Sequence, residues 1–145
     1  MEIQIRQITL DDAKEIHRLT VELGYKIPLL ETAANVEAVI SHPDNCGRVA
    51  IHAGNIVGWV HAFKALRIET RPFVEIGGLV VDEALRGRGI GKKMIESVKQ
   101  WCVECKIPIL RLRTNTKRKE AHQFYRSLGF TEIKEQKVFE LKVFS

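Results

Sequence analysis

A glycine-rich basic turn at residues 86–91, with the sequence RGRGIG, constrains the fold of this chain more than any other segment. An apolar, β-leaning run at residues 73–81 precedes it, and a sequence with apolar residues at helical spacing follows it. A strand, a glycine turn and a helix in this order direct unpaired backbone N–H groups and the positive end of the helix dipole at one place. We therefore predict an anion-binding site at this turn, although glycines that only form a tight turn would give the same sequence.

Two familiar phosphate-binding motifs do not fit the turn. A P-loop would need Gly in place of Arg86 and Ser or Thr in place of Lys93. A dinucleotide-binding fingerprint would need Gly at Lys92 or at Met94, depending on where it starts. The sequence therefore supports neither nucleotide hydrolysis nor nicotinamide binding.

Positive charge is concentrated around the same turn. Residues 86–119 hold 11 Lys/Arg against 2 Asp/Glu, whereas residues 1–85 hold 8 against 12 and residues 120–145 hold 4 against 4. Such a segment favours binding of a polyanion, which could be a phosphate-rich cofactor or nucleic acid. A basic surface that is only solvated has the same composition. A non-catalytic nucleic-acid-binding regulatory module is thus an alternative, but the sequence contains no recognition-helix or RNA-binding aromatic motif to support it.

Composition predicts one folded domain over residues 1–145. The chain is 45% apolar and 28% charged, close to soluble globular averages, and no apolar run approaches the roughly 20 residues needed to span a membrane. The first residues lack the order of a signal peptide, so we expect a cytoplasmic protein. Its three cysteines, Cys46, Cys102 and Cys105, are an odd and sparse set, so we expect reduced thiols and no disulfides. Cys102 and Cys105 have no second cysteine pair with which to bind a metal, so we expect them to be core thiols.

The other elements follow from apolar spacing and turn residues. Thr9 and Asp12 are predicted to cap a first helix, Gly54 and Asn55 to form a hairpin turn, and Gly77 to mark a β-bulge with Gly78. The expected strands lie at residues 3–8, 48–53, 56–66, 73–81, 109–114 and 138–144, and the expected helices at residues 10–23, 36–40, 90–105 and 119–128. The order β-α-α-β-β-β-α-β-α-β predicts an α/β fold of the α+β type with a mixed sheet.

Two motifs in this order carry a family resemblance. The first is R-x-x-G-x-G, formed by Arg86, Gly89 and Gly91, and the second is A-x-x-F-Y-x-x-L-G-F, which starts at Ala121. With the element order, they make the sequence similar to the GNAT superfamily of acyl-CoA-dependent N-acyltransferases over nearly the whole chain. The resemblance implies a GNAT-like N-acetyltransferase domain that moves an acetyl group from acetyl-CoA to a primary amine by direct attack.

By this resemblance, backbone amides of the turn hold the pyrophosphate of CoA, and the preceding strand pairs with the pantetheine arm. The turn residues are Arg86, Gly87, Arg88, Gly89, Ile90, Gly91 and Lys92, and the strand residues are Leu79, Val80 and Val81. Arg118 stands where the family often has Asn, so the resemblance leaves two candidates for this contact with CoA, Arg118 itself and Asn115, which would reach the pantetheine. Basic residues 117–119 either reach the adenosine 3′-phosphate or form a solvated loop.

The resemblance also implies catalytic residues. Glu75 is the candidate general base for the amine, although a structural ion pair with Arg71 or Arg113 is an equal alternative. Tyr125 matches the tyrosine that assists the departing thiolate; since proton transfer from tyrosine to an alkyl thiolate is uphill by about 1.5 pKa units, hydrogen-bond donation to the sulfur is its expected role. As an alternative, Tyr125 is a core aromatic residue.

The sequence leaves several residue roles and functions open. His61 and His122 are lesser candidates for a base, and the Leu79 amide is a candidate donor to the thioester oxygen. The net negative charge of residues 1–85 favours a cationic small-molecule acceptor such as an aminoglycoside or polyamine, and protein amines are an alternative. A non-catalytic acyl-CoA-binding protein and a homodimer are further alternatives.

Overall fold

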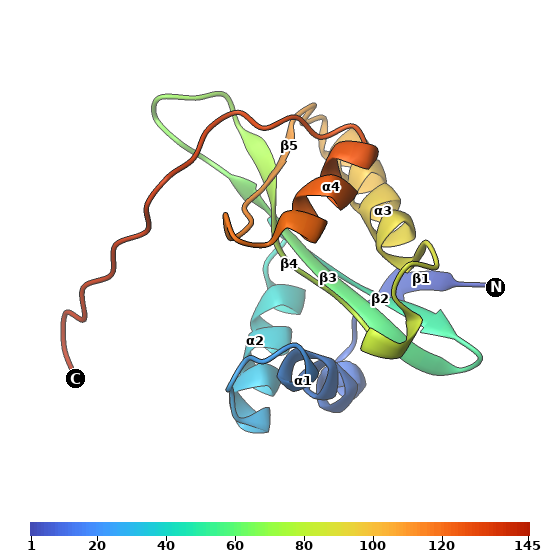
Figure 1. Ribbon diagram of the computed structural model, residues 1–145. Helices are drawn as coiled ribbons and strands as arrows, with labels where there is room; N and C mark the ends of the chain where they lie inside the picture. Colours follow the sequence, from blue (N-terminus) through green and yellow to red (C-terminus); the bar gives the residue numbers. More distant parts are fainter. The chain divides into compact units, whose positions relative to one another are not determined.

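The computed structural model describes all residues from 1 to 145, and the chain divides into two compact units, Met1–Arg113 and Thr114–Ser145. The first unit contains a five-stranded sheet with helices on both faces (Figure 1). The second contains one helix and the C-terminal segment. The expectation of a single domain over residues 1–145 therefore stays a prediction.

The sheet of the first unit is mixed, as the sequence predicts, with strand order β1-β2-β3-β4-β5. Its strands are β1 (Gln4–Gln7), β2 (Asn45–His52), β3 (Asn55–Ala65), β4 (Phe73–Val81) and β5 (Leu110–Leu112). The first four strands pair antiparallel with their neighbours, and β5 runs parallel to β4. The helices are α1 (Ala13–Glu22), α2 (Leu29–Ser41) and α3 (Ile90–Cys105), with short 3₁₀ turns η1 (Leu10–Asp12) and η2 (Glu83–Leu85).

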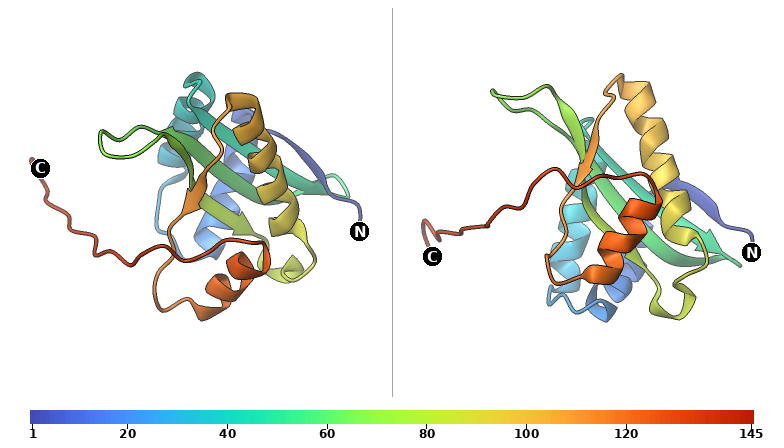
Figure 2. Two further views of the ribbon diagram at one scale, coloured as in Figure 1. Left: turned by 90° about the horizontal axis from the view of Figure 1, so that it is seen from above. Right: turned by 45° about the horizontal axis from the view of Figure 1, so that its top comes forward.

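Alternate side chains of β3 face different helices, which places α3 on one face of the sheet and α1 with α2 on the other (Figure 2). Trp59 faces α1, where its indole Nε1 donates a hydrogen bond to Thr20 Oγ1 at 3.2 Å. Gly58 faces α3, where a Cβ at its position would lie 3.0 Å from Met94 Cε. The core between the layers includes the fully buried side chains of Phe73, Leu19, Ile90, Met94 and Val98.

The hairpin between β2 and β3 turns one residue earlier than predicted. His52 pairs with Asn55, so the turn residues are Ala53 and Gly54, with φ of 50° and 79°. A two-residue loop with positive φ at both positions matches the twist of antiparallel strands, and the glycine adopts this conformation freely.

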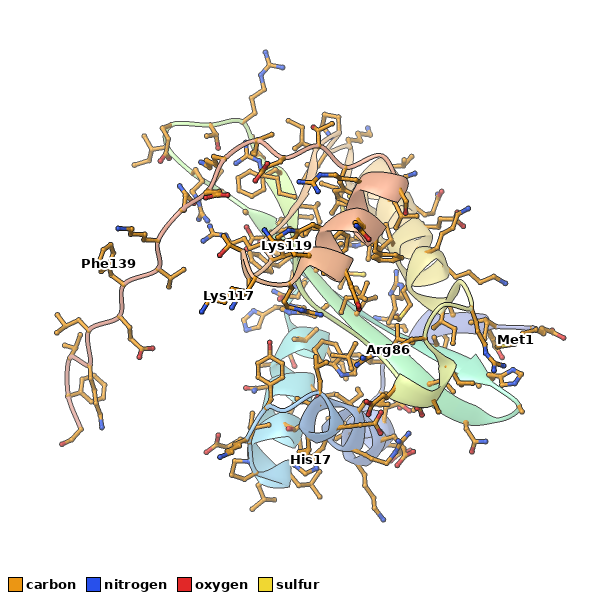
Figure 3. All side chains as sticks on the ribbon, in the orientation of Figure 1. Met1, His17, Arg86, Lys117, Lys119 and Phe139 are labelled. Atoms are coloured by element: carbon orange, nitrogen blue, oxygen red, sulfur yellow. The ribbon has the colours of Figure 1, made fainter.

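The predicted last strand at residues 138–144 is wrong. No regular structure forms there, and the apolar side chains of this segment are exposed, with Phe139 at 88% (Figure 3). The alternating pattern is compatible with a strand, but a strand forms only when its N–H and C=O groups have a partner, and no backbone group of this segment has one within the chain. The predicted order therefore holds through the second unit's helix, α4 (Lys119–Ser127), and fails after it.

A buried carboxylate connects β1 to the start of α1. Asp12, 4% exposed, accepts hydrogen bonds from Arg6 Nη1 and Nη2 at 2.7 and 2.8 Å and from the Thr9 N–H at 2.8 Å. This confirms the predicted Thr9–Asp12 cap. Hydrogen bonding to Arg6 lowers the pKa of Asp12 against the opposing effect of burial, and the Thr9 N–H lowers it further.

We expect Asp12→Ala to lower the free energy of unfolding at pH 7 by about 2–3 kcal/mol, because it removes both the ion pair and the cap. The folded state binds the proton on Asp12 more weakly than the unfolded state does. The pair therefore stabilises the protein above the usual carboxyl pKa, and its contribution is lost as the pH falls through the folded-state pKa. Urea unfolding from pH 7 to pH 3 should show the difference between wild type and variant shrinking, whereas Asp11→Ala, at an exposed neighbour, should change little at any pH. Equal unfolding midpoints for Asp12→Ala and wild type at pH 7 would contradict this account.

Candidate functional site

The glycine turn has the backbone geometry of an anion site. Gly87 and Gly89 have φ of 79° and 83°, and no atom lies within 4 Å of a Cβ built on either. Glycine is therefore needed at these positions for backbone conformation and not for space. Gly89 is the N-cap of α3 and makes no side-chain cap, so the first amides of the helix have no partner from the chain.

Seven consecutive backbone amides of the turn are free. No N–H from residue 86 to residue 92 donates a hydrogen bond within the chain, and the first helical bond runs from Lys93 N to Gly89 O at 3.1 Å. The first turn of α3 holds no acidic residue and has the exposed Lys92 and Lys93 instead. Cations at a helix N-terminus oppose the helix dipole, so this arrangement is favourable only when an anion is present.

Four basic residues of this segment have no ion-pair partners. They are Arg86, Arg88, Lys92 and Lys93, and all four are exposed. Arg86 projects from the segment that leads into α3 (Figure 3). None of the ion pairs of the protein involves them, so their charge is available to a ligand.

The start of the turn is fastened to α1. Asp82 Oδ1 accepts a hydrogen bond from Ala84 N at 3.0 Å, and Glu22 Oε1 on α1 accepts one from Glu83 N at 2.9 Å. Arg18 Nη1 lies 3.7 Å from Asp82 Oδ2. These contacts fix the point at which β4 leaves the sheet, and so help to define where the free amides of the turn lie.

The C-terminal half of β4 has an open edge. β5 pairs with β4 only at Val74, Glu75 and Ile76, so residues 77–81 have a strand partner on the β3 side alone. The register with β3 shifts between His61, which pairs with Gly78, and Ala62, which pairs with Ile76. Gly77 is therefore the extra residue of a β-bulge, as the sequence predicts.

The bulge changes which backbone groups face the open edge. Before it, Val74 N donates to Ile109 O at 2.9 Å, on the β5 side. After it, Asp82 N donates to Val57 O at 2.8 Å, on the β3 side. Since residues of an antiparallel pair alternate in the direction of their N–H and C=O groups, Gly78 and Val80 point these groups at β3.

Leu79 and Val81 consequently present their N–H and C=O groups along the open edge, next to the glycine turn. An extended ligand with amide groups can pair with this edge as a further strand would. Val80, which sequence analysis grouped with them, directs its backbone groups at β3 and buries its side chain. Its contribution to the site is to the packing beneath the edge.

The bulge glycines allow two rings of β3 to approach closely. A Cβ at Gly78 would lie 2.7 Å from Trp59 Cη2, and one at Gly77 would lie 3.0 Å from His61 Nδ1. His61 Nε2 donates a hydrogen bond to Asn45 Oδ1 at 2.7 Å. Sequence analysis gave His61 little weight and missed Asn45, because the two residues are 16 positions apart and only the pairing of β2 with β3 brings them together.

Glu75 has the structural partner that sequence analysis left open. Arg113 Nε lies 3.4 Å from Glu75 Oε1, and the carboxylate side chain is 13% exposed. Of the two partners considered, Arg113 makes this contact and Arg71 makes none. Phe63 is directly opposite Glu75 in the β3–β4 register, so Glu75 shares a sheet face with Phe63 and His61.

The second unit holds Tyr125 on α4. Its ring packs near those of Phe124 and Phe130, with centroids 5.1 and 5.8 Å away. Burial raises the pKa of Tyr125, and the nearby Arg118 only partly opposes it. A raised pKa makes proton release harder and keeps the hydroxyl group as a hydrogen-bond donor.

Asn115 lies in a turn that leads to α4 and not at a strand end, because β5 stops at Leu112. Its Oδ1 accepts a hydrogen bond from Lys117 N at 2.9 Å, and its backbone O accepts one from His122 Nε2 at 2.9 Å. The carboxamide oxygen of Asn115 therefore has a local partner already. The hydrogen bond from His122 connects α4 to the turn before it, which is a structural role.

The cysteines and the potential metal ligands of the chain do not form a further site. Burial raises the pKa of the Cys46 and Cys102 thiols, as expected for core residues, and all three cysteines are free. No group of three or more His, Cys, Asp or Glu side chains is arranged to hold a metal ion. None of the helices combines the length and the apolar character required to cross a bilayer.

Comparison with known proteins identifies the family. Residues 10–130 match the Acetyltransferase (GNAT) family, and the chain therefore belongs to this family of acetyltransferases. An aminoalkylphosphonate N-acetyltransferase of Salmonella typhimurium is 24% identical over 131 residues, which cover 89% of this chain and 85% of that protein. An N-acetylaspartate synthetase of Danio rerio is 31% identical over 89% of this chain, which spans only 45% of that larger protein.

Solved structures share the fold. The aminoglycoside N-acetyltransferase AAC(6′)-Iy, in complex with a bisubstrate analogue that contains CoA, superposes with a TM-score of 0.88 at 19% identity, over 98% of this chain and 99% of that one. A transcriptional regulator from Bacillus halodurans gives a TM-score of 0.83 at 22% identity, over 97% of this chain and 100% of that one. At these identities the likeness establishes the fold and leaves the substrate open.

We expect Gly78→Ala to destabilise the protein by about 1–3 kcal/mol, because the added Cβ would overlap the Trp59 ring and force it to move. The change should appear both in urea unfolding and in the tryptophan fluorescence of the folded state. Trp59→Phe provides the matched background, since a smaller ring leaves room for the methyl group. If Gly78→Ala costs as much in that background as in wild type, the close contact is not the cause.

Proposed function

We propose that this protein is an acetyl-CoA-dependent N-acetyltransferase that acts on a primary amine. The observation that carries the proposal is the run of free amides at residues 86–92, which leads into α3 in a segment with four exposed basic side chains that make no ion pair. A diphosphate is a suitable ligand for such a site, because it carries two negative charges and many acceptor oxygens. Membership of the GNAT family supports CoA as the molecule that carries this diphosphate.

The open edge of β4 supports the same ligand. Leu79 and Val81 direct peptide groups along this edge towards the glycine turn, so a chain with amide groups attached to the diphosphate has hydrogen-bond partners there. The pantetheine arm of CoA is such a chain. Acetyl-CoA, when bound, supplies an acetyl group activated as a thioester, and the Leu79 N–H is our candidate donor to the thioester oxygen.

The acceptor amine must lose a proton before or during attack. Amines of the lysine type are protonated at neutral pH, so a base is needed within reach of the attacking nitrogen. Glu75 is one candidate, although Arg113 shares its carboxylate. Tyr125, kept protonated by its raised pKa, is the candidate hydrogen-bond donor to the departing sulfur.

The acceptor is proposed as a class. The similar proteins are named as an aminoalkylphosphonate N-acetyltransferase, an N-acetylaspartate synthetase and an aminoglycoside N-acetyltransferase. Each of these names implies a small primary amine, and the net negative charge of residues 1–85 favours a cationic member of that class. Release of CoA in a panel of aminoglycosides, polyamines, amino acids and aminophosphonates would identify it.

Calorimetry with acetyl-CoA tests the cofactor assignment. Wild-type protein should bind with micromolar affinity, and the double substitution Arg86→Ala with Arg88→Ala should weaken binding about tenfold to a hundredfold, because each charge-assisted contact contributes about 1.5–3 kcal/mol and both residues are exposed and partly screened by solvent. Lys99→Ala, an exposed lysine further along α3, is the matched control and should leave the affinity near that of wild type. Absence of heat with acetyl-CoA or CoA on folded wild-type protein would reject the proposal. Steep salt-dependent DNA or RNA binding in its place would support the nucleic-acid-binding alternative.

The C-terminal segment supports a homodimer as a second part of the proposal. Val138, Phe139, Leu141, Val143 and Phe144 are 81–88% exposed, and no backbone group there has a partner within the chain. Two copies of this segment are complementary when paired antiparallel with Leu141 opposite Leu141. That register places Phe139 opposite Val143 and Glu140 opposite Lys142, which is the self-complementarity of a two-fold interface.

Charge reversal tests this register. Glu140→Lys or Lys142→Glu alone should weaken a concentration-dependent dimer in sedimentation velocity, since each places like charges opposite one another twice. The combined substitution should restore the dimer, because it exchanges the charges and keeps their complementarity. A protein that is monomeric at all concentrations, or that dimerises equally in all three variants, contradicts the proposed pairing.

A further inference from the structure

His61 has one ring nitrogen occupied and the other free. Its Nε2 lies 2.7 Å from Asn45 Oδ1, and because an amide oxygen carries no hydrogen, Nε2 must hold the proton of the neutral ring. Nδ1 is then an unprotonated acceptor. It makes no hydrogen bond with any group of the chain.

The free nitrogen faces the β-bulge. A Cβ built on Gly77 would lie 3.0 Å from Nδ1, so Nδ1 lies against the surface that the missing side chain leaves open. Gly77 itself is exposed, whereas the His61 ring is partly buried. Gly77 lies two residues before Leu79, in the part of β4 that β5 does not cover and along which the proposed acyl donor would lie.

The surroundings favour the neutral form of the ring. Burial lowers the pKa of His61, and no charged group contributes to the shift. Glu75 shares this face of the sheet and has Arg113 as its partner, and Arg111 lies over the Phe73 ring. Asp44, next to Asn45 in the chain, pairs with Lys64 at 3.5 Å. A neutral imidazole with a free Nδ1 is a competent proton acceptor at pH 7.

We propose that His61 is the general base for the acceptor amine, taking its proton at Nδ1, and that Asn45 is a positioning residue that fixes the ring and its tautomer. The inference rests on the proposed acetyltransferase function. The amine nitrogen forms a bond to the acyl carbon as the carbon–sulfur bond breaks. The nitrogen's proton passes to Nδ1, and the electron pair of the broken bond leaves with the sulfur. Solvent then takes the proton from the imidazolium.

This assignment separates His61 from Glu75. The Glu75 carboxylate is already held in an ion pair with Arg113, whereas Nδ1 of His61 has no hydrogen-bond partner within the chain. Asn45 acts on the ring as the orienting partner of a catalytic histidine does, by holding the proton on the nitrogen that takes no part in the reaction.

Nitrogen NMR tests the tautomer without any reaction. In wild-type protein labelled with ¹⁵N at histidine, the His61 ring should show a protonated Nε2 and an unprotonated Nδ1 at pH 7. Asn45→Ala should give a mixture of tautomers, because the acceptor that selects Nε2–H is gone. A wild-type ring protonated at Nδ1, or charged at pH 7, overturns the proposal whatever the acetyltransferase assays show.

Kinetics test the role. With an amine that wild type acetylates, His61→Gln should keep the acetyl-CoA affinity, lower kcat about 100-fold or more and remove the acid limb of the kcat–pH profile. Asn45→Ala should lower kcat with little change in KM, and Asn45→Asp should restore activity with the acid limb moved to higher pH, since a carboxylate raises the pKa of its histidine partner. His52→Gln, on a histidine bound to Glu2 O, is the matched control.

The outcomes distinguish a failure of the proposed acetyltransferase function from a failure of the general-base assignment to His61. Wild-type protein that binds no acetyl-CoA removes the proposed function, and the general-base role falls with it. An active wild type with an equally active His61→Gln, or an acid limb lost in Glu75→Gln and kept in His61→Gln, overturns the base assignment alone. Folding of each variant is checked by its acetyl-CoA affinity and its amide NMR spectrum.

Discussion

The β-bulge at Gly77 is the local constraint on which the proposed site depends. One additional residue in β4 reverses the alternation of its backbone groups, so that Leu79 and Val81 point away from β3 where β5 no longer covers the edge. The same residue lacks a side chain, which allows the His61 ring to lie against the backbone. An open set of peptide groups on β4 and a free imidazole nitrogen on the neighbouring β3 therefore depend on one irregularity, and β4 leads directly into the glycine turn.

The start of α3 is electrostatically unfavourable without a ligand, which is why it indicates an anion-binding site. Seven free amides and two lysines in the first turn are electrostatically unfavourable for the isolated helix. The buried residues of α3, among them Met94 and Val98, hold the helix in place through packing, so the unfavourable end persists in the folded protein. Binding of a diphosphate would convert this cost into affinity without rearrangement of the backbone.

Much of this arrangement could be predicted from residue patterns because it depends on neighbours in the chain. The Thr9–Asp12 cap, the bulge and the glycine turn before α3 are local features with recognisable residues, and the structure has them all. The strand expected at residues 138–144 did not form, because an alternating pattern specifies a β-compatible segment but does not supply the partner strand. The hairpin turn was displaced by one residue for a related reason, since cross-strand register decides which residues occupy the loop.

By itself, the sequence determined the class of fold and the location of the proposed anion site, because glycine spacing, helical periodicity and charge are properties of contiguous residues, and its two motifs carried the resemblance to the family. Only the tertiary structure decided which side chains meet. It placed Arg113 beside Glu75, and it placed Asn45 beside His61 so that one ring nitrogen is held and the other is free. These contacts depend on the register of paired strands, which joins residues that are distant in the chain, and no local pattern encodes them.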